Sequence, residues 1–265
     1  MSRFKLYIEY EGTRYSGWQV QKNARTVQGE LIGAMKKVFN TDKFELYGAG
    51  RTDAGVHALE QVAHLDVKTM LAPEIIRMKV NDELPADVSL TEVEKARPDF
   101  HARHDAIART YLYQISRRRT AFGKRYVWWI KDKLDVHKLN EVLQLFVGMK
   151  NMQSFTDDDP EEKSTKVLIE KIEVGEAGDL ILVRITGSHF VWKLVRRIVG
   201  VSAEVARGKK SMNDVKRFLA TRSSEPARHT APPSGLFLER IVYKGEGFPS
   251  SLTPLLLVGS RRSSC

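Results

Sequence analysis

The chain has 265 residues with 43 Lys and Arg against 33 Asp and Glu, and its net charge of +10 favours a polyanionic partner. Its hydrophobic content of 42% is that of an ordinary globular protein, and no apolar run approaches the roughly 18 residues of a membrane span. The single cysteine, Cys265, excludes an intrachain disulfide and a thiolate zinc site. We expect a cytoplasmic protein that binds no membrane.

The first 98 residues alternate between strand and helix patterns. Alternating apolar residues predict a strand from Phe4 to Tyr10, and Thr26 is a suitable N-cap for a helix whose apolar residues recur at helical spacing through Val38. Further along we expect, in order, a strand at 44–47, a glycine-rich turn, a strand at 61–67, a helix from Pro73 to about Val80 and a loop at 81–87.

The rest of the chain repeats this alternation after a boundary near Arg97 and Pro98. The alternation predicts an α+β (mixed α/β) fold with two domains, 1–98 and 99–265. The Ser- and Arg-rich end, GSRRSSC, is expected to belong to a mobile tail from about residue 247. The expected elements are a strand at 110–115, an amphipathic helix at 134–147, paired strands at 167–174 and 180–186, helices at 190–207 and 212–220, and a strand at 237–243.

Positive charge gathers in two segments that lie far apart in the sequence. Nine basic residues and two acids fall within 95–125, and nine basic residues and two acids fall within 189–222. Two such segments suggest a polyanion-binding face assembled from distant parts of the chain. A well-solvated basic surface without a ligand would have the same composition, so charge alone leaves this alternative open.

The stretch GAGRTDAGVHA, residues 48–58, lies between two predicted strands. It does not fit a dinucleotide-binding loop, because Asp53 stands where the third glycine would fall and a strand follows instead of a helix. It does not fit a P-loop either, because no Gly-Lys-Ser/Thr is present and a carboxylate would repel a phosphate. What remains is a tight turn that presents Arg51 and Asp53. A purely structural turn is equally compatible with the pattern, and a lone His57 is more often structural than catalytic.

The same stretch and the motifs around it resemble the TruA family of tRNA pseudouridine synthases. The resemblance implies the pseudouridine synthase fold, with two α/β subdomains whose sheets are flanked by helices and a basic catalytic cleft between them. It also implies an isomerase that converts uridine to pseudouridine without a cofactor, at positions 38–40 of the tRNA anticodon arm. The likeness covers nearly the whole chain, through LYIEYEG (6–12), YSGWQ (15–19), DFHAR (99–103), ARTYLY (108–113), FVWKLVRRIVG (190–200) and APPSGLFL (231–238).

The resemblance implies a role for each candidate site residue. Asp53 is the catalytic carboxylate, and both attack on carbon and removal of a sugar proton are open to it. Tyr111 stacks on the flipped uracil and takes part in proton exchange at C5, while Leu236 forms an apolar wall against the same base. Arg51 fills the space that the base leaves or grips its phosphate, with His57 nearby. On the residues alone, Tyr111 and its strand neighbour Tyr113 could both be core aromatics.

Arg196 is the expected partner of Asp53. An aspartate in a site that excludes water needs a nearby cation, because desolvation alone raises the pKa of a carboxyl group. On its predicted helix, Arg196 lies opposite the apolar stripe that includes Leu194 and Ile198, yet it too has apolar neighbours, which indicates a charged partner. An arginine that extends to solvent is the alternative.

The two basic segments are expected to bind tRNA through its phosphates. Each neutralised phosphate steepens the salt dependence of the affinity by up to about 0.9 on a log-log scale. The resemblance also implies a homodimer in which one subunit positions the RNA for the other. The candidate RNA-binding residues are Arg103, Arg109, Arg117, Arg118, Lys193 and Arg197.

The sequence leaves open the role of one acidic segment and a choice between several functions of the chain. Five acids within 157–162 depart from the basic or small residues of many relatives, and they could form a solvated loop, a clamp on a basic segment or a metal site. His101 and His104 invite a metal interpretation, but no cysteine lies near them. The chain could also be an N-glycosidase that releases the base, a synthase that acts on other RNA, or a non-catalytic RNA-binding protein.

Overall fold

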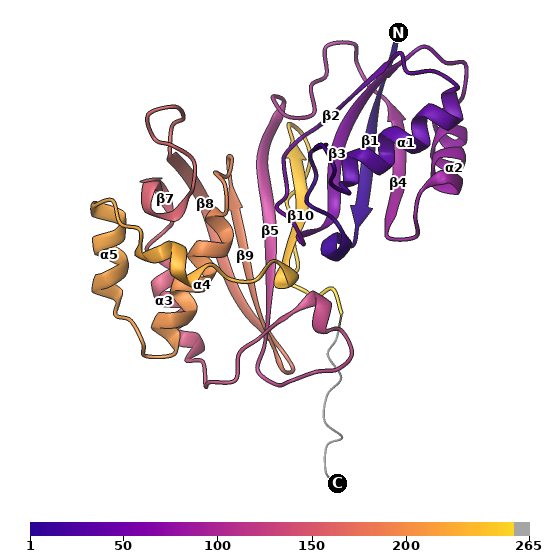
Figure 1. Cartoon of the computed structure of the whole chain (residues 1–265). Helices are drawn as coiled ribbons and strands as arrows, with labels where there is room; N and C mark the ends of the chain where they lie inside the picture. The colour runs from indigo at the N-terminus through magenta and orange to yellow at the C-terminus, as the bar shows by residue number, and fades with distance from the viewer. Residues whose placement is uncertain (257–265) are drawn as a thin grey trace. The chain divides into compact units, whose positions relative to one another are not determined.

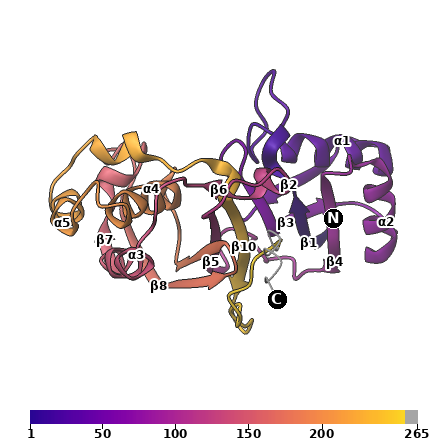
Figure 2. The same ribbon diagram turned by 90° about the horizontal axis from the view of Figure 1, so that it is seen from below.

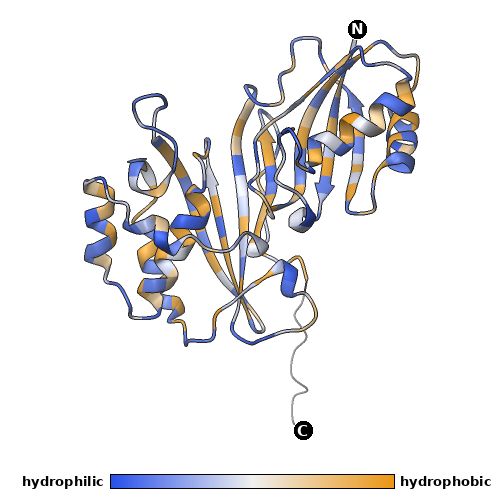
Figure 3. Ribbon diagram, viewed as in Figure 1, coloured by the Kyte–Doolittle hydropathy of each residue, from blue (hydrophilic) through white to orange (hydrophobic). Residues whose placement is uncertain are grey.

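The computed structural model describes residues 1–256, and the mixed α/β prediction is confirmed (Figure 1). The chain divides into two compact units. The first comprises Met1–Ile107 and Phe237–Phe248, and the second comprises Ala108–Leu236 and the described residues 249–256. Hydrophobic residues follow the strands of both units, and the connecting loops are largely hydrophilic (Figure 3). The expected mobile end, GSRRSSC, falls outside the described residues.

The first unit is a sheet with two helices. The predicted cap of its first helix is confirmed, because Thr26 Oγ1 accepts a hydrogen bond of 3.3 Å from the Gly29 amide. This helix, α1 (Val27–Phe39), packs on α2 (Pro73–Glu83), which in turn contacts the sheet. The sheet consists of β1 (Ser2–Tyr10), which pairs antiparallel with β3 (His57–Val67) and β4 (Val88–Lys95), and of β2 (Phe44–Gly48) and β10 (Leu236–Tyr243), which both pair with β3.

The strand β4 is one that the sequence pattern does not indicate. The spacing of its buried residues changes from two positions to three after Leu90. On the neighbouring β1, Tyr7 pairs with Glu92 and Ile8 pairs with Leu90, so one residue of β4 bulges out between them. The bulge breaks the regular alternation of buried and exposed residues by which a strand is recognised in a sequence.

The last strand belongs to the first unit, so the two units differ from the expected domains 1–98 and 99–265. β10 pairs parallel with β3, with Phe237 opposite His57 and Leu238 opposite Ala58. The first boundary also falls later than expected, between residues 107 and 108. An apolar alternation predicts a strand but not the distant strand with which it pairs, and that pairing decides the unit to which β10 belongs.

In its described residues, the second unit is a largely antiparallel sheet with three α-helices. Its α5 (Met212–Ala220) has the predicted bounds, whereas α4 begins at Leu194 instead of at residue 190, because Lys193 has a φ of 62°. The predicted hairpin of two paired strands is confirmed as β8 (Lys166–Ala177) and β9 (Leu180–Gly187). The strand order is β5 (Ala106–Ser116), β9, β8 and β7 (Gly148–Asn151), with β6 (Trp128–Trp129) parallel to β5, and α3 (Val136–Gln144) packs against α4 (Leu194–Ala206) (Figures 1 and 2).

The chain from Pro249 to Leu255 is attached to the second unit, which differs from the expectation of a mobile tail from about residue 247. The Leu255 amide donates a hydrogen bond of 2.8 Å to the side-chain oxygen of Gln114. The buried guanidinium of Arg184 donates to the Ser251 carbonyl, and the Leu252 side chain packs against Gly175. These contacts satisfy polar groups of the sheet, and they extend order at least to residue 255.

A buried histidine in β3 makes the stability of the first unit depend on pH. His64 Nδ1 accepts a hydrogen bond of 3.2 Å from the Ala102 amide, and its ring lies 5.2 Å from the ring of Tyr47. Burial, together with the neighbouring cation of Arg3, lowers the pKa of His64 from 6.5 to about 4. Between these two values the unfolded chain binds a proton at His64 that the folded chain does not bind. The free energy of unfolding should therefore fall as the pH falls from 6.5 to 4.

The first prediction concerns this histidine. In wild type, the contribution of His64 to the free energy of unfolding should change by up to about 1.4 kcal/mol per pH unit across this window, and His64→Gln should remove that part of the pH dependence. Urea unfolding at several pH values measures both. His137→Gln, at an exposed position on α3, is the matched control and should retain the wild-type dependence. Identical pH profiles for wild type and His64→Gln would contradict the assignment.

Candidate active site

The turn that carries Asp53 joins β2 to β3 and is closed by hydrogen bonds. The Val56 amide donates to the Asp53 carbonyl over 3.1 Å, and the hydroxyl groups of the buried Thr52 and of Tyr10 share a hydrogen bond of 2.8 Å. The turn leaves Arg51 exposed and Asp53 half-buried. The backbone thus holds this carboxylate in a defined place without covering it, as a group that must meet a substrate requires.

The loop at residues 11–19 packs directly on this turn. The Trp18 amide donates to the Thr52 carbonyl over 3.1 Å, and the Gly55 amide donates to the Tyr15 carbonyl over 3.2 Å. Gly17 has a φ of +92°, and a Cβ at this position would lie 2.5 Å from the Thr52 carbonyl oxygen. YSGWQ and GAGRTDAGVHA are therefore two parts of one structure. Sequence reasoning missed this contact, for which the glycine of YSGWQ is the one available signal.

His57 lies behind the turn, as the first residue of β3. Its Nδ1 accepts a hydrogen bond of 3.0 Å from the Gly12 amide, and its ring stacks on Phe237 with 4.8 Å between centroids. The side chain is almost completely buried, which fits the structural alternative better than direct contact with a substrate. His57 fastens the loop at 11–19 to β3 and so supports the turn from within the first unit.

The two tyrosines of β5 differ in their surroundings. Tyr113 is fully buried, and its hydroxyl donates to the Pro232 carbonyl over 2.7 Å. Burial raises the pKa of Tyr113 well above 10, although the nearby cation of Arg196 opposes this shift, so the phenol stays protonated. Tyr111 is also buried but is 9% exposed, and it meets the ring of Phe190 edge to face at 5.0 Å. Tyr113 is thus a core residue, and Tyr111 remains the candidate for stacking.

Arg196 is held against the segment that leads to Leu236. Its Nε donates to the Ala231 carbonyl over 2.8 Å, and the Ala231 amide donates back to the Arg196 carbonyl over 3.0 Å. This segment then passes Tyr113 and ends in a 3-10 turn before the buried Leu236. The structure therefore brings Arg196 and the first residues of the motif APPSGLFL (231–238) together within the second unit. Because Asp53 belongs to the first unit, its pairing with Arg196 stays a prediction.

The acidic segment clamps the start of α4. Asp157 forms ion pairs with the buried Arg197 and with Lys193, the latter at 2.7 Å. Asp158 accepts a hydrogen bond of 2.9 Å from the Trp192 amide. Of the three interpretations that the sequence allows, the clamp on a basic segment describes these contacts. No group of three or more His, Cys, Asp or Glu in residues 1–256 is arranged to hold a metal ion.

Several predicted phosphate contacts are already engaged within the protein. Arg197 is only 3% exposed and paired with Asp157, so it is not a surface cation, contrary to the expectation. Arg103 is exposed. The charge of a segment overstates its attraction for RNA, because acids from other segments lie against it. The engaged groups are Arg109 with the Ser188 carbonyl, Arg117 with Glu176, Arg118 with Asp179, and Lys193 with Asp157.

The second prediction tests this clamp. Asp157→Asn should lower the free energy of unfolding by about 2 kcal/mol, because it leaves the buried Arg197 guanidinium without its carboxylate. Chemical denaturation at neutral pH measures the change. Asp159→Asn, in the same segment and with no ion pair identified, is the matched control and should have little effect.

The effect of Asp157→Asn should also depend on pH. Burial tends to raise the pKa of Asp157, but hydrogen bonds from Lys193 and Arg197 outweigh it and hold the pKa below its ordinary value of 3.8. The stabilisation is therefore complete above that value and is lost as the pH falls through the lowered pKa. The difference between wild type and variant should shrink in acid, and a difference that is constant down to pH 2 would contradict the pairing.

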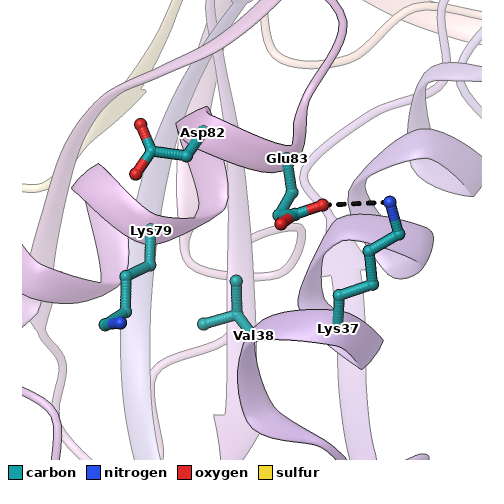
Figure 4. Close-up of a pocket in the computed structure, with 5 residues that line it drawn as sticks. All are labelled: Lys37, Val38, Lys79, Asp82 and Glu83. Carbon is teal, nitrogen blue, oxygen red and sulfur yellow. Dashed lines mark hydrogen bonds and ion pairs between the residues drawn. The ribbon is translucent and has the colours of Figure 1, made fainter.

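One surface hollow is evident away from these residues. It has a volume of about 240 Å³, lies between α1 and α2, and is bordered by the ion pair of Lys37 and Glu83 at 2.9 Å (Figure 4). Val38 is its one apolar lining residue. It contains none of the predicted site residues, and its charged lining does not suit a stacked base.

Comparisons with known proteins assign the chain to one class of enzymes, the RNA pseudouridine synthases. A family model described as tRNA pseudouridine synthase matches residues 6–105 and 142–244, and the chain belongs to this family. Both the Asp53 turn and α4 lie inside the matched ranges. Tyr111 lies between them, so its role depends on the motif ARTYLY and on the geometry of β5.

The similarity extends over the full length of curated relatives. A protein from Brachyspira hyodysenteriae named tRNA pseudouridine synthase A is 37% identical over 93% of this chain and 100% of its own length. Proteins of the same name from Rhodopseudomonas palustris and Geobacillus kaustophilus are 38% and 36% identical over 92% and 94% of this chain, and over 100% and 98% of their own lengths. A solved Cbf5-Nop10-Gar1 complex covers 75% of this chain and 53% of its own at 11% identity, with a TM-score of 0.34, a likeness too weak to bear on function.

In the described residues, no helix is both long and apolar enough to cross a membrane.

Proposed function

We propose that the chain isomerises uridine to pseudouridine in tRNA, at positions 38–40 of the anticodon arm. The observation that carries the proposal is the half-buried Asp53 on a hydrogen-bonded turn, in a chain that belongs to the tRNA pseudouridine synthase family. The names of full-length relatives support tRNA as the substrate. The reaction breaks the bond between ribose C1′ and uracil N1, turns the base and forms a bond between C1′ and C5. N1 gains a proton and C5 loses one.

Each site residue has a proposed part in this reaction. Asp53 acts at the sugar, either by attack on carbon or by removal of a proton, and Arg196 is its proposed cationic partner. Tyr111 stacks on the extruded uracil and Leu236 forms an apolar wall against it. Extrusion of a base costs a few kcal/mol, and stacking on an aromatic ring contributes about 1–3 kcal/mol per base, so these contacts can offset the cost. Exposed Arg51 grips the phosphate or fills the space of the base.

Product analysis on defined tRNA tests the proposal. Unmodified transcripts that carry a single uridine at position 38, 39 or 40 are incubated with the protein, and the products are mapped for pseudouridine. The proposal requires pseudouridine at these positions with no loss of base. Free uracil would indicate an N-glycosidase, modification confined to other positions or other RNA would indicate a different specificity, and bound but unchanged RNA would indicate a non-catalytic binding protein.

We further propose that the active form is a cytoplasmic homodimer, as the family resemblance implies. The second copy would position the RNA for the first. Light scattering on the purified protein should then give a mass twice that of the 30.2 kDa chain. A monomer that retains full turnover would contradict this part of the proposal.

A further inference from the structure

The segment at residues 117–129, RRRTAFGKRYVWW, combines exposed aromatic side chains with positive charge. We name it the basic aromatic finger. It joins β5 to β6 and contains five cations and no acid. It lies between the two ranges that the family model matches. The reaction proposed for Asp53 and Tyr111 makes no use of it.

The finger has a well-anchored stem. Trp128 and Trp129 pair in parallel with the end of β5, and the Ile130 amide donates to the Ser116 carbonyl over 3.1 Å. The Gln114 side chain donates to the Tyr126 carbonyl over 2.8 Å. One end of the finger continues from β5 and the other is hydrogen-bonded to the same strand, so the backbone is fixed at the base of the finger.

The tip of the finger exposes a phenylalanine beside cations. Phe122 is 91% exposed and precedes Gly123, which has a φ of +75°, and a 3-10 turn that begins with the exposed Lys124 and Arg125. Trp129 is 41% exposed, and the guanidinium of Arg119 lies 5.9 Å from its ring. Aromatic rings next to cations are the means by which proteins bind unpaired nucleotides, through base stacking and phosphate contacts. This charge disfavours an apolar protein partner.

The stem is also connected to the segment that carries a proposed site residue. Ser234 Oγ donates to the Val127 carbonyl over 3.2 Å. Ser234 belongs to the motif APPSGLFL (231–238), in which Leu236 is proposed to contact the extruded uracil. A hydrogen bond therefore joins the finger to the segment of the second unit that is proposed to contact the reacting base.

From these contacts we infer that the basic aromatic finger binds an unpaired nucleotide of the same RNA, near the target uridine. Phe122 stacks on the base, and Lys124 and Arg125 contact its phosphates. The inference rests on the proposed function for the identity of the RNA. It adds a second stacking position to the one at Tyr111, and it explains why a large apolar side chain remains in water in the unbound protein.

Binding of unmodified tRNA by wild type and variants tests the inference. Phe122→Ala should raise the Kd for tRNA and the KM about tenfold, within the range that the loss of one stacked base produces. Phe122→Tyr should restore both values. Met70→Ala, at a fully exposed apolar position of the first unit, is the matched control and should bind as wild type does. Because Phe122 is exposed, Phe122→Ala should not change the thermal unfolding midpoint of the protein. A midpoint within a degree of the wild-type value verifies this.

Two further binding measurements establish which kind of ligand the finger binds. Lys124→Ala should reduce the salt dependence of tRNA binding by about 0.7 to 0.9 in log-log slope, whereas Phe122→Ala should leave the slope unchanged. A fully paired RNA duplex should bind wild type and Phe122→Ala equally. A Kd for tRNA within twofold of wild type in Phe122→Ala, or an equal loss of affinity for duplex, would overturn the inference. The inference would also be overturned if Phe122→Ala weakened binding to vesicles of anionic lipid but not binding to RNA.

These outcomes separate the inference from the proposed function. If wild type forms pseudouridine and Phe122→Ala has the wild-type Kd and KM, the finger inference fails and the proposed function stands. If wild type binds tRNA through Phe122 but forms no pseudouridine, the proposed function fails and the binding role of the finger stands.

Discussion

Asp53→Asn should lower the rate of pseudouridine formation by at least about a thousandfold and leave the fold intact. Asparagine has the shape of aspartate but no negative charge, and it can neither attack a carbon nor accept a proton at neutral pH. The turn itself depends on the Asp53 carbonyl and on Thr52, which the substitution does not alter. Single-turnover kinetics on an unmodified tRNA transcript measures the rate, and thermal unfolding verifies the fold.

A matched surface variant makes this result specific. Asp42→Asn removes an exposed carboxylate of the same unit, one that pairs with Lys36 at 2.7 Å, and it should react at the wild-type rate. Binding of tRNA by Asp53→Asn should be at least as tight as in wild type, because loss of an acid does not weaken attraction to phosphates. A rate for Asp53→Asn within tenfold of wild type would refute the catalytic role of this residue.

Gly200→Ala should destabilise the protein by about 3 kcal/mol or more, which corresponds to a fall of roughly 10 °C in the unfolding midpoint. A Cβ at residue 200 would lie 1.6 Å from the His229 carbonyl oxygen and 2.9 Å from the Ala231 nitrogen. Both are backbone atoms, so the segment must move away from α4. The hydrogen bonds between Arg196 and Ala231 would then break, and pseudouridine formation should fall together with stability.

The first unit offers a matched control for this variant. Gly33 also lies inside a 13-residue helix, α1, and a Cβ there would meet nothing within 4 Å. Gly33→Ala should stabilise the protein by about 0.5–1 kcal/mol, because alanine loses less backbone freedom on folding. Calorimetry on both variants gives the comparison. If Gly200→Ala is as stable as wild type, the close approach of the segment at 229–231 to α4 is not present in solution.

The starts of α1 and α5 could be predicted from the sequence because the residues that cap a helix lie next to it in the chain. Thr26 begins α1 as expected, and α5 begins after Ser211, whose side chain and that of Asp214 form a capping box. Features that depend on distant pairing could not be predicted in this way. The bulge in β4 arises from its partner β1, and the return of β10 to the first unit arises from its pairing with β3.

The candidate site shows the same division. The order of Arg51 and Asp53 on a tight turn could be predicted from the glycines around them. The burial of His57 could not, since it follows from packing against the Gly12 amide and Phe237. A clamp by the acidic segment on a basic one was among the three interpretations, but its partner Arg197 could not be identified, because Asp157 and Arg197 are 40 positions apart and a charge count treats each segment alone.

Release of tritium from tRNA labelled at uridine C5 tests the central claim most directly, because isomerisation must replace the C5–H bond by a bond to C1′. Wild type should release tritium to water in proportion to the pseudouridine formed, with no free uracil, and Asp53→Asn should release none above background. Tritium retained in free uracil, or release that is unchanged in Asp53→Asn, would contradict isomerisation by this carboxylate.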